Sequence, residues 1–297
     1  MTWLTWRQQR TEFLITIAVL ATCALALTAT RILMGYDYAA LGQGCENHPA
    51  TALCDPTTFD NKWGGVPQFL LVFYLVPIVA AMFIAAPLVS GEVEHGTHYL
   101  IWTQGVTRSR WIAIKLAWIV GGGLLVGAGL SLLVSWWRQP FDKLAGTSMA
   151  PFSFDQEGTI TVGVFLFALA LGIAASALLR RTLPAMAVLL FVFAVVRLGV
   201  VVGVPHLMPT VTLLPFTVNT PIGSDAQVPV GLTVGQYIVD VPCPPQSPAN
   251  ETCQADAIQI VTDAYFWRLQ LLETGIYVGL GGILLWLAFH WVRRRIT

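Results

Sequence analysis

Residues 160–204 read ITVGVFLFALALGIAASALLRRTLPAMAVLLFVFAVVRLGVVVGV, which is two apolar blocks separated by Arg180 and Arg181. A helix that rises 1.5 Å per residue needs about 20 apolar residues to cross about 30 Å of hydrocarbon. Each block has about that length. The stretch therefore predicts two membrane-spanning helices joined by a short basic turn.

The rest of the chain repeats this pattern. Further apolar blocks cover residues 13–33, 69–88, 112–134 and 271–289, which with 160–179 and 183–204 gives six expected spans. The chain is 56% hydrophobic and 11% charged, whereas soluble domains have roughly 45–50% apolar and about 25% charged residues. The net charge of +0 argues against a nucleic-acid partner. We expect an all-α membrane protein with a single transmembrane domain over residues 1–297.

The basic residues orient the expected spans. Short cytoplasmic loops of membrane proteins keep an excess of Lys and Arg. Ten of the sixteen basic residues fall on one face of the predicted topology: Arg7, Arg10, Arg108, Arg110, Lys115, Arg180, Arg181, Arg293, Arg294 and Arg295. We therefore expect a multi-pass membrane protein with both termini in the cytoplasm.

The cysteines agree with that orientation. Cys45 and Cys54 fall in the first expected outer loop, and Cys243 and Cys253 fall in the last. Outer loops are open to oxidation, so our hypothesis is two local disulfides, Cys45–Cys54 and Cys243–Cys253. Four cysteines allow three connectivities, and free thiols are the alternative.

Sequence motifs for catalysis are missing. The chain has no G-x-x-x-x-G-K-[S/T] loop for phosphates, and residues 121–123 (GGG) lie inside an apolar block. It also lacks G-x-S-x-G, C-x-x-C and H-E-x-x-H. We expect no catalytic residue and no cofactor in this chain, so nucleotide chemistry would belong to another protein.

One polar segment separates the second and third blocks. It reads SGEVEHGTH over residues 90–98 and WTQGVTRSRW over residues 102–111. One interpretation is a metal site built from Glu92, Glu94, His95 and His98, although the flanking glycines favour turns that would break the geometry. The other interpretations are a short cytoplasmic helix that presents acids to a partner protein, or a solvated loop.

Residues 87–115 resemble the intracellular loop of ATP-binding-cassette (ABC) type-2 permeases, particularly those of actinobacteria. The resemblance rests on Glu92, Gly96-Thr97, Trp102-Thr103-Gln104, Thr107-Arg108 and Arg110-Trp111, and its general layout extends over nearly the whole chain. It implies a coupling helix that docks on an ATPase, with Glu92, Glu94, His95, Gly96 and Thr97. It also implies an amphipathic N-terminal elbow helix at the membrane surface, with Trp3, Trp6, Arg7 and Arg10.

The resemblance implies a location in a bacterial plasma membrane, and it implies a function as well. The chain would be the permease subunit of an exporter, with a second permease copy or a paralogue completing the path and a cytoplasmic ABC ATPase binding ATP and Mg²⁺. Drug-like, peptide and lipid substrates all stay open. The alternatives are an ATPase-independent sensor, assembly factor or channel, and an intramembrane enzyme built on Glu92, His95 and His98.

Charged and aromatic residues inside the blocks suggest where a substrate could pass. Charged side chains such as those of Arg197 and Glu273 are energetically unfavourable in lipid, so we expect the two to form an intramembrane charge pair. Contact of Arg197 with a substrate is the alternative. The expected substrate path comprises Phe73, Tyr74, Phe83, Phe191 and Arg197, with lipid-facing packing as the other explanation for the aromatic residues. The proline-rich residues 205–265 predict an ordered extracellular cap. The resemblance implies that this region forms re-entrant segments and an outer gate.

Overall fold

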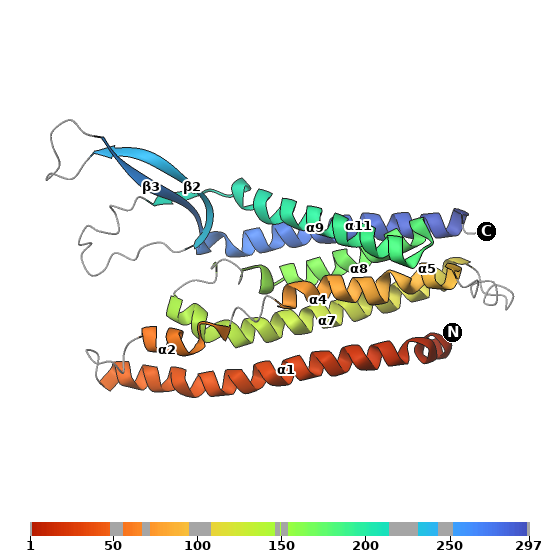
Figure 1. Ribbon diagram of the computed structural model, residues 1–297, viewed down its shortest axis with the longest axis horizontal. Helices are drawn as coiled ribbons and strands as arrows, with labels where there is room; N and C mark the ends of the chain where they lie inside the picture. Colours follow the sequence, from red (N-terminus) through yellow and green to blue (C-terminus); the bar gives the residue numbers. More distant parts are fainter. Residues whose placement is uncertain are drawn as a thin grey trace.

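The structure is a computed structural model of the chain, and it describes residues 2–47, 56–66, 72–94, 108–145, 149, 154–213, 231–242 and 252–295. Long helices lie side by side, and a small sheet projects from one end (Figure 1). The elements, in chain order, are α1 (Thr2–Asn47), α2 (Pro56–Trp63), α4 (Val72–Ala80), the π-helix η2 (Ala81–Ala85), α5 (Pro87–Glu94), α7 (Arg108–Ala145), the 3-10 turn η3 (Phe154–Gln156), α8 (Ile160–Leu179), α9 (Thr182–Gly203), the 3-10 turn η4 (Pro205–Leu207), β1 (Val211–Leu213), β2 (Gly231–Pro242), β3 (Thr252–Thr262), the 3-10 turn η5 (Asp263–Tyr265) and α11 (Phe266–Arg295).

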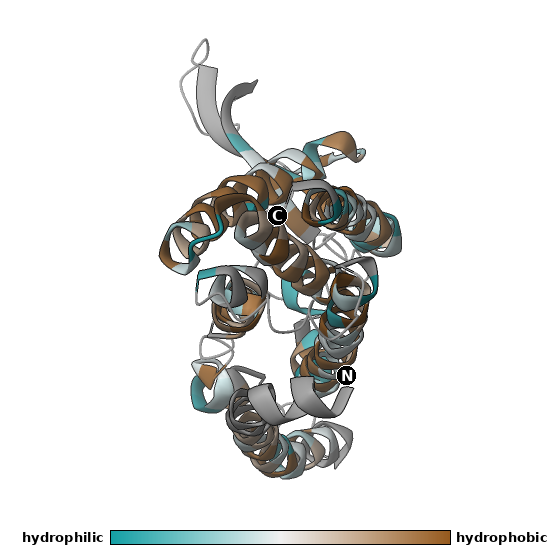
Figure 2. Cartoon of the chain, turned by 90° about the vertical axis from the view of Figure 1, so that its right-hand side faces the viewer, coloured by the Kyte–Doolittle hydropathy of each residue, from teal (hydrophilic) through white to brown (hydrophobic). Residues whose placement is uncertain are grey.

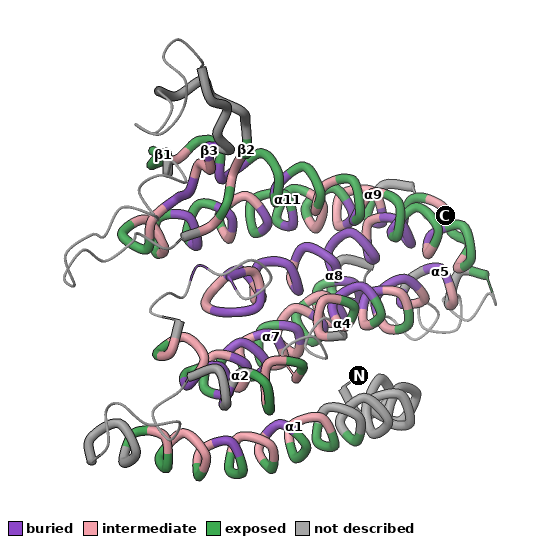
Figure 3. The backbone as a smooth tube through the Cα atoms, turned by 60° about the vertical axis from the view of Figure 1, so that its left-hand side comes forward, coloured by how far each residue is buried: buried purple, intermediate pink, exposed green. Residues whose placement is uncertain are grey.

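Helix α8 forms the centre of the bundle. Of its most apolar stretch 72% is buried inside the chain, against 22% for α9 and 22% for α11. The burial colouring shows this difference directly, with a mainly buried α8 and largely exposed outer faces on α9 and α11 (Figure 3). An apolar helix that is exposed on its outer face suits a lipid surround. The hydropathy colouring agrees, since apolar residues dominate the helices in the end-on view (Figure 2).

Glycines let the neighbours of α8 approach closely. A Cβ atom placed on Gly172 would lie 2.9 Å from Cβ of Ala85 in η2, and one on Gly127 of α7 would lie 3.3 Å from Cβ of Phe165. Small residues at such crossings allow tight packing without large side chains. The π-turn itself is closed by the amide of Ala86, which donates to the carbonyl of Ala81 over 2.8 Å.

Four of the expected spans coincide with helices that are long and apolar enough to cross a membrane. These helical stretches are Arg110–Leu144, Ile160–Leu179, Thr182–Leu207 and Asp263–Arg293. The expected span at 13–33 lies within the long α1, and the one at 69–88 is divided among α4, η2 and α5. The protein is therefore a mostly helical membrane protein with four candidate spans in the described part of the chain.

The N-terminal elbow is not a separate helix. Residues 3–10 form the first turns of α1, which continues without a break from Thr2 to Asn47. The side chains of Trp3, Trp6, Arg7 and Arg10 lie outside the described part of the structure. Their place at a membrane surface stays a prediction.

The expectation of a wholly helical fold is wrong for the segment that follows α9. Strand β3 pairs antiparallel with both β1 and β2, in the order β1-β3-β2. The ladder runs from Gly231 opposite Thr262 to Pro242 opposite Thr252, with an irregularity between Thr233 and Gly235. Runs such as YIVDV and AIQIV contain the β-branched and aromatic residues that favour strands. The described part of 205–265 thus forms a sheet with short 3-10 turns. Its role as an extracellular cap stays a prediction.

The proposed disulfides lie outside what the structure describes. Cys54 and Cys243 are not placed, and only the backbone is described for Cys45 in α1 and for Cys253 in β3, where Cys253 stands opposite Val241. Both pairings stay predictions.

Candidate functional site

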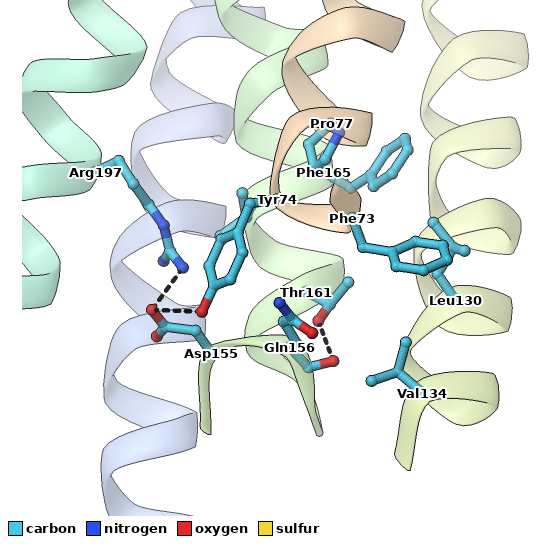
Figure 4. A pocket seen from close by; sticks show the side chains of 11 residues that line it. Phe73, Tyr74, Pro77, Leu130, Val134, Asp155, Gln156, Thr161, Phe165 and Arg197 are labelled. Carbon is cyan, nitrogen blue, oxygen red and sulfur yellow. Dashed lines mark hydrogen bonds and ion pairs between the residues drawn. The ribbon is translucent and has the colours of Figure 1, made fainter. Parts of the chain in front are cut away.

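An ion pair joins α9 to the turn before α8. Nη2 of Arg197 lies 2.9 Å from Oδ2 of Asp155, and both side chains are about 15% exposed. Nη1 of Arg197 donates a 2.9 Å hydrogen bond to the hydroxyl of Tyr277 in α11. The hydroxyl of Tyr74 in α4 donates to the same Asp155 oxygen over 3.5 Å. Four elements therefore meet at one buried polar centre. Figure 4 shows Arg197, Asp155 and Tyr74 of this centre.

The expectation that Arg197 pairs with Glu273 is wrong. The structure pairs Arg197 with Asp155, while Glu273 makes no ion pair with it. Asp155 reaches Arg197 because the turn η3, which precedes α8, lies close to α9 and α4 (Figure 4). Burial raises the pKa of Asp155, and the positive charge of Arg197 opposes that rise.

Gln270 of α11 fixes the turn that carries Asp155. Its Oε1 accepts hydrogen bonds from the amides of Thr159, over 3.0 Å, and Ile160, over 3.2 Å. Its Nε2 donates to the carbonyl of Phe154 over 2.9 Å. The first amides of a helix have no partner within the helix, so Gln270 caps the start of α8 from a neighbouring element. Gly158 has a φ of +62°, and a Cβ there would lie 2.7 Å from Oε1 of Gln270, so glycine suits both the conformation and the space.

A groove opens beside this centre. It has a volume of about 790 Å³ and lies among α4, α9, the start of α11 and β2. Most of its wall is apolar, formed by Leu75, Ile78, Phe154, Leu190, Phe193, Ala194, Leu198, Val201, Val202, Pro205, Leu232 and Val234. The polar lining residues are Tyr74, Asp155, Arg197, His206, Thr233 and Glu273. An apolar cavity of this size with a few polar groups is typical of a small-molecule site.

The structure divides the expected substrate path. Tyr74 and Arg197 line the groove, and with Phe73 they also line a smaller adjoining cavity of about 30 Å³ (Figure 4). Phe83 and Phe191 are 62% and 71% exposed and line neither cavity. Within a single chain their aromatic rings therefore face outward, as lipid-facing packing predicts.

A second charged cluster lies near the first. Nε of Arg138 in α7 lies 2.6 Å from Oε1 of Glu157, and Nη2 of Arg138 donates to Oδ1 of Asp142 over 3.4 Å. Burial raises the pKa of Glu157 to about 7, the nearby Asp142 adds to the rise, and Arg138 opposes it. Neither Gln270 nor this cluster was expected from the sequence, because such contacts join residues of different elements and leave no local pattern.

At the opposite end of the bundle, hydrogen bonds join α5 to α8 and α9. Oε2 of Glu94 accepts from the amide of Thr182, over 3.3 Å, and from its hydroxyl, over 3.0 Å. The amide of Ser90 donates to Oγ of Ser176 over 2.7 Å, and the hydroxyls of Ser90 and Thr182 lie 3.1 Å apart. Glu94 thus caps the N-terminus of α9, where a negative charge is favourable.

The expected coupling residues are placed only in part. Helix α5 does contain Glu92 and ends at Glu94, but the side chain of Glu92 lies outside the described part, as do His95, Gly96 and Thr97. No group of three or more His, Cys, Asp or Glu residues suitable for a metal occurs among the described residues. The alternative metal site also used His95 and His98, which are not described.

A comparison with protein-family models identifies the family to which the chain belongs. The model of a family described as ABC-2 membrane transporter related matches residues 17–204, which is more than half of the chain. Neither curated proteins nor solved structures gave a match. The matched range ends with α9, so the sheet and α11 lie beyond it. The chain is a membrane component of a transporter and belongs to the ABC-2 membrane transporter-related family.

Proposed function

We propose that the chain is the permease subunit of an ABC exporter. Two permease copies, identical or paralogous, would enclose the translocation path, and a separate ATPase would bind ATP and Mg²⁺. Family membership supports this, together with the absence of any phosphate-binding loop from the sequence. The exposed apolar faces of α9 and α11 leave room for both lipid and a second copy.

In this proposal α1 and the broken α4-η2-α5 segment supply the first and second of the six spans in chain order. Helix α1 begins at the same end of the bundle where α11 ends, and the strands lie at the other end (Figure 1). The turn at Arg180 and Arg181 and the start of α7 lie at the end with the termini. We place that end in the cytoplasm of a bacterial cell, because short cytoplasmic loops retain basic residues, and the strands outside as an extracellular cap.

The contact of Glu94 with Thr182 is the observation on which this proposal rests most. A coupling segment must pass movement from an ATPase to the path. Glu94 ends α5 and holds the start of α9, and α9 carries Arg197 at the groove. A push on the segment after α5 would therefore move α9 as a rigid rod and alter the groove at its far end.

The test is co-expression with ABC ATPases from the same genome, followed by purification and measurement of ATP hydrolysis. Glu92→Arg, which reverses a charge on α5, should weaken assembly or stimulated hydrolysis at least about tenfold, a loss of about 1.4 kcal/mol. Glu94→Gln is the matched control, since its amide oxygen still accepts from Thr182 while the local charge changes.

One result would overturn the proposal, and a second would overturn only the role of α5 in docking. The chain could purify without an ATPase under every nucleotide condition, which would favour an ATPase-independent sensor, assembly factor or channel. Alternatively, the complex could form and hydrolyse ATP equally well with Glu92→Arg and with the wild type, which would remove α5 from the docking surface.

A further inference from the structure

Glu273 is a buried carboxyl group in the wall of the groove. It lies two turns into α11, its residue is 1% exposed, and it lines the groove together with Arg197 and Asp155. Within the described part of the chain, its Oε2 accepts no hydrogen bond. A buried carboxylate without a partner is strongly unfavourable, so such a group either holds a proton or binds a cationic ligand that displaces the proton.

The other charges around the groove do not supply a counter-ion. Arg197 is engaged by Asp155 at 2.9 Å and by the hydroxyl of Tyr277 at 2.9 Å. The ring of His206 is exposed and has its Nδ1 2.7 Å from the carbonyl of Val202. The Asp155 and Arg197 charges cancel, and ionised Glu273 leaves the described lining with one uncompensated negative charge.

The remainder of the wall fits a hydrophobic body. Apolar side chains of α9 line one side, and Leu232 and Val234 of β2 line another. Phe154 and Phe193 add aromatic surface, which attracts cations as well as apolar groups. A volume of about 790 Å³ suits a molecule of drug size.

We propose that this groove binds a lipophilic organic cation, with its apolar body against α9 and β2 and its positive centre beside Glu273. This names a substrate class for the proposed exporter, and in that sense it rests on the proposed function. Binding itself needs only the permease chain. Glu273, Leu232 and Val234 all lie beyond the range that the family model matches, so the negative end of the groove comes from the part of the chain outside that range.

The probes are tetraphenylphosphonium and tetraphenylborate, which have nearly the same shape and opposite charges. Saturable binding to the full chain in phosphatidylcholine nanodiscs is measured by equilibrium dialysis, with empty nanodiscs subtracted. Wild type should bind the phosphonium saturably and at least about tenfold more tightly than the borate. Glu273→Gln should lose at least about tenfold in phosphonium affinity, because a charged contact is replaced by a neutral one.

Three further variants sharpen the test. Glu273→Asp keeps the charge and should retain most of the affinity. Asp263→Asn removes an exposed acid from η5, near the start of α11 but outside the groove lining, and should have no effect. Leu198→Trp fills the groove from α9 without changing its charge and should abolish binding, so it tests the site even if Glu273→Gln fails to fold.

Unchanged phosphonium affinity in Glu273→Gln and Leu198→Trp, or equal saturable binding of the borate, would overturn the proposal and favour a lipid tail or a neutral amphiphile in the groove. The two proposals fail separately. If the chain binds phosphonium but associates with no ATPase, the binding site stands and the exporter proposal is wrong. If the chain couples to an ATPase but does not bind phosphonium, the exporter proposal stands and the binding-site proposal is wrong.

Discussion

The two ends of the bundle hold their polar groups in different ways. Where α5 meets α9, Ser90, Ser176 and Thr182 form hydrogen bonds through hydroxyl and backbone groups. The hydroxyl of Thr182 also donates to the carboxylate of Glu94. At the end beneath the sheet, oppositely charged side chains such as Arg197 and Asp155 are paired in partly buried positions. Neutral hydrogen bonds contribute about 1 kcal/mol each and exchange readily, whereas separating a buried ion pair costs several times as much. The first end suits a moving joint, and the second suits a rigid binding site.

Breaking the ion pair should have the largest effect. Arg197→Leu leaves Asp155 buried without its counter-ion and should lower the free energy of unfolding by about 3 kcal/mol. The measurement is SDS-induced unfolding in mixed micelles, followed by circular dichroism.

The double variant Arg197→Leu/Asp155→Leu is the control. It removes both charges together and should recover most of the loss, because an apolar pair of similar size replaces the ion pair. A double variant as unstable as the single one would show that the charges contribute through other contacts.

Removing the cap of α8 should come next. Gln270→Leu leaves the amides of Thr159 and Ile160 without their acceptor in a buried place, which should cost about 2 kcal/mol in the same unfolding assay. Gln270→Glu keeps an acceptor at the helix N-terminus and should cost less. Equal losses in both variants would contradict the role of the side chain as a cap.

The charged cluster at Glu157 should make stability depend on pH. The native state holds this proton up to about pH 7, whereas the unfolded chain releases it near the ordinary value of 4.5. Between these values the unfolded state binds fewer protons, so stability should fall as pH rises from 4.5 to about 7, by up to about 1.4 kcal/mol per pH unit, and then level off. Measuring the free energy of unfolding of wild type and of Glu157→Gln across this pH window isolates the contribution of Glu157. If the free energy depends on pH with the same slope in both proteins, the prediction is wrong.

The smallest effect is expected at the joint between α5 and α9. Glu94→Ala removes the acceptor for the amide and hydroxyl of Thr182 and should cost about 1 kcal/mol. Glu94→Gln should be close to wild type in stability. Because the joint would transmit movement, Glu94→Ala should also reduce ATPase stimulation in the assembled complex more than it reduces stability; a parallel loss of both would make the contact merely structural.

Much of the helical layout followed from the sequence. The blocks at 160–179 and 183–204 coincide closely with α8 and α9. The length of an apolar run is a local property of the sequence, and it decides whether a helix can span the hydrocarbon layer. Tyr74 and Arg197 were expected on the substrate path, and both line the groove. Phe83 and Phe191 were not separable from them, since residue type alone does not tell which face of a helix points inward.

What the sequence determined by itself is that the chain is a helical membrane protein with basic residues gathered on one face of its topology. Only the tertiary structure decided that Arg197 meets Asp155, that Gln270 caps α8 and that β1, β2 and β3 form a sheet. It also decided that Oε2 of Glu273, in the groove wall, has no hydrogen-bond partner among the described residues. The reason is physical. Span length depends on neighbouring residues along one helix, whereas the partner of a buried charge depends on which helices pack together, and about 40 residues separate Asp155 from Arg197 along the chain.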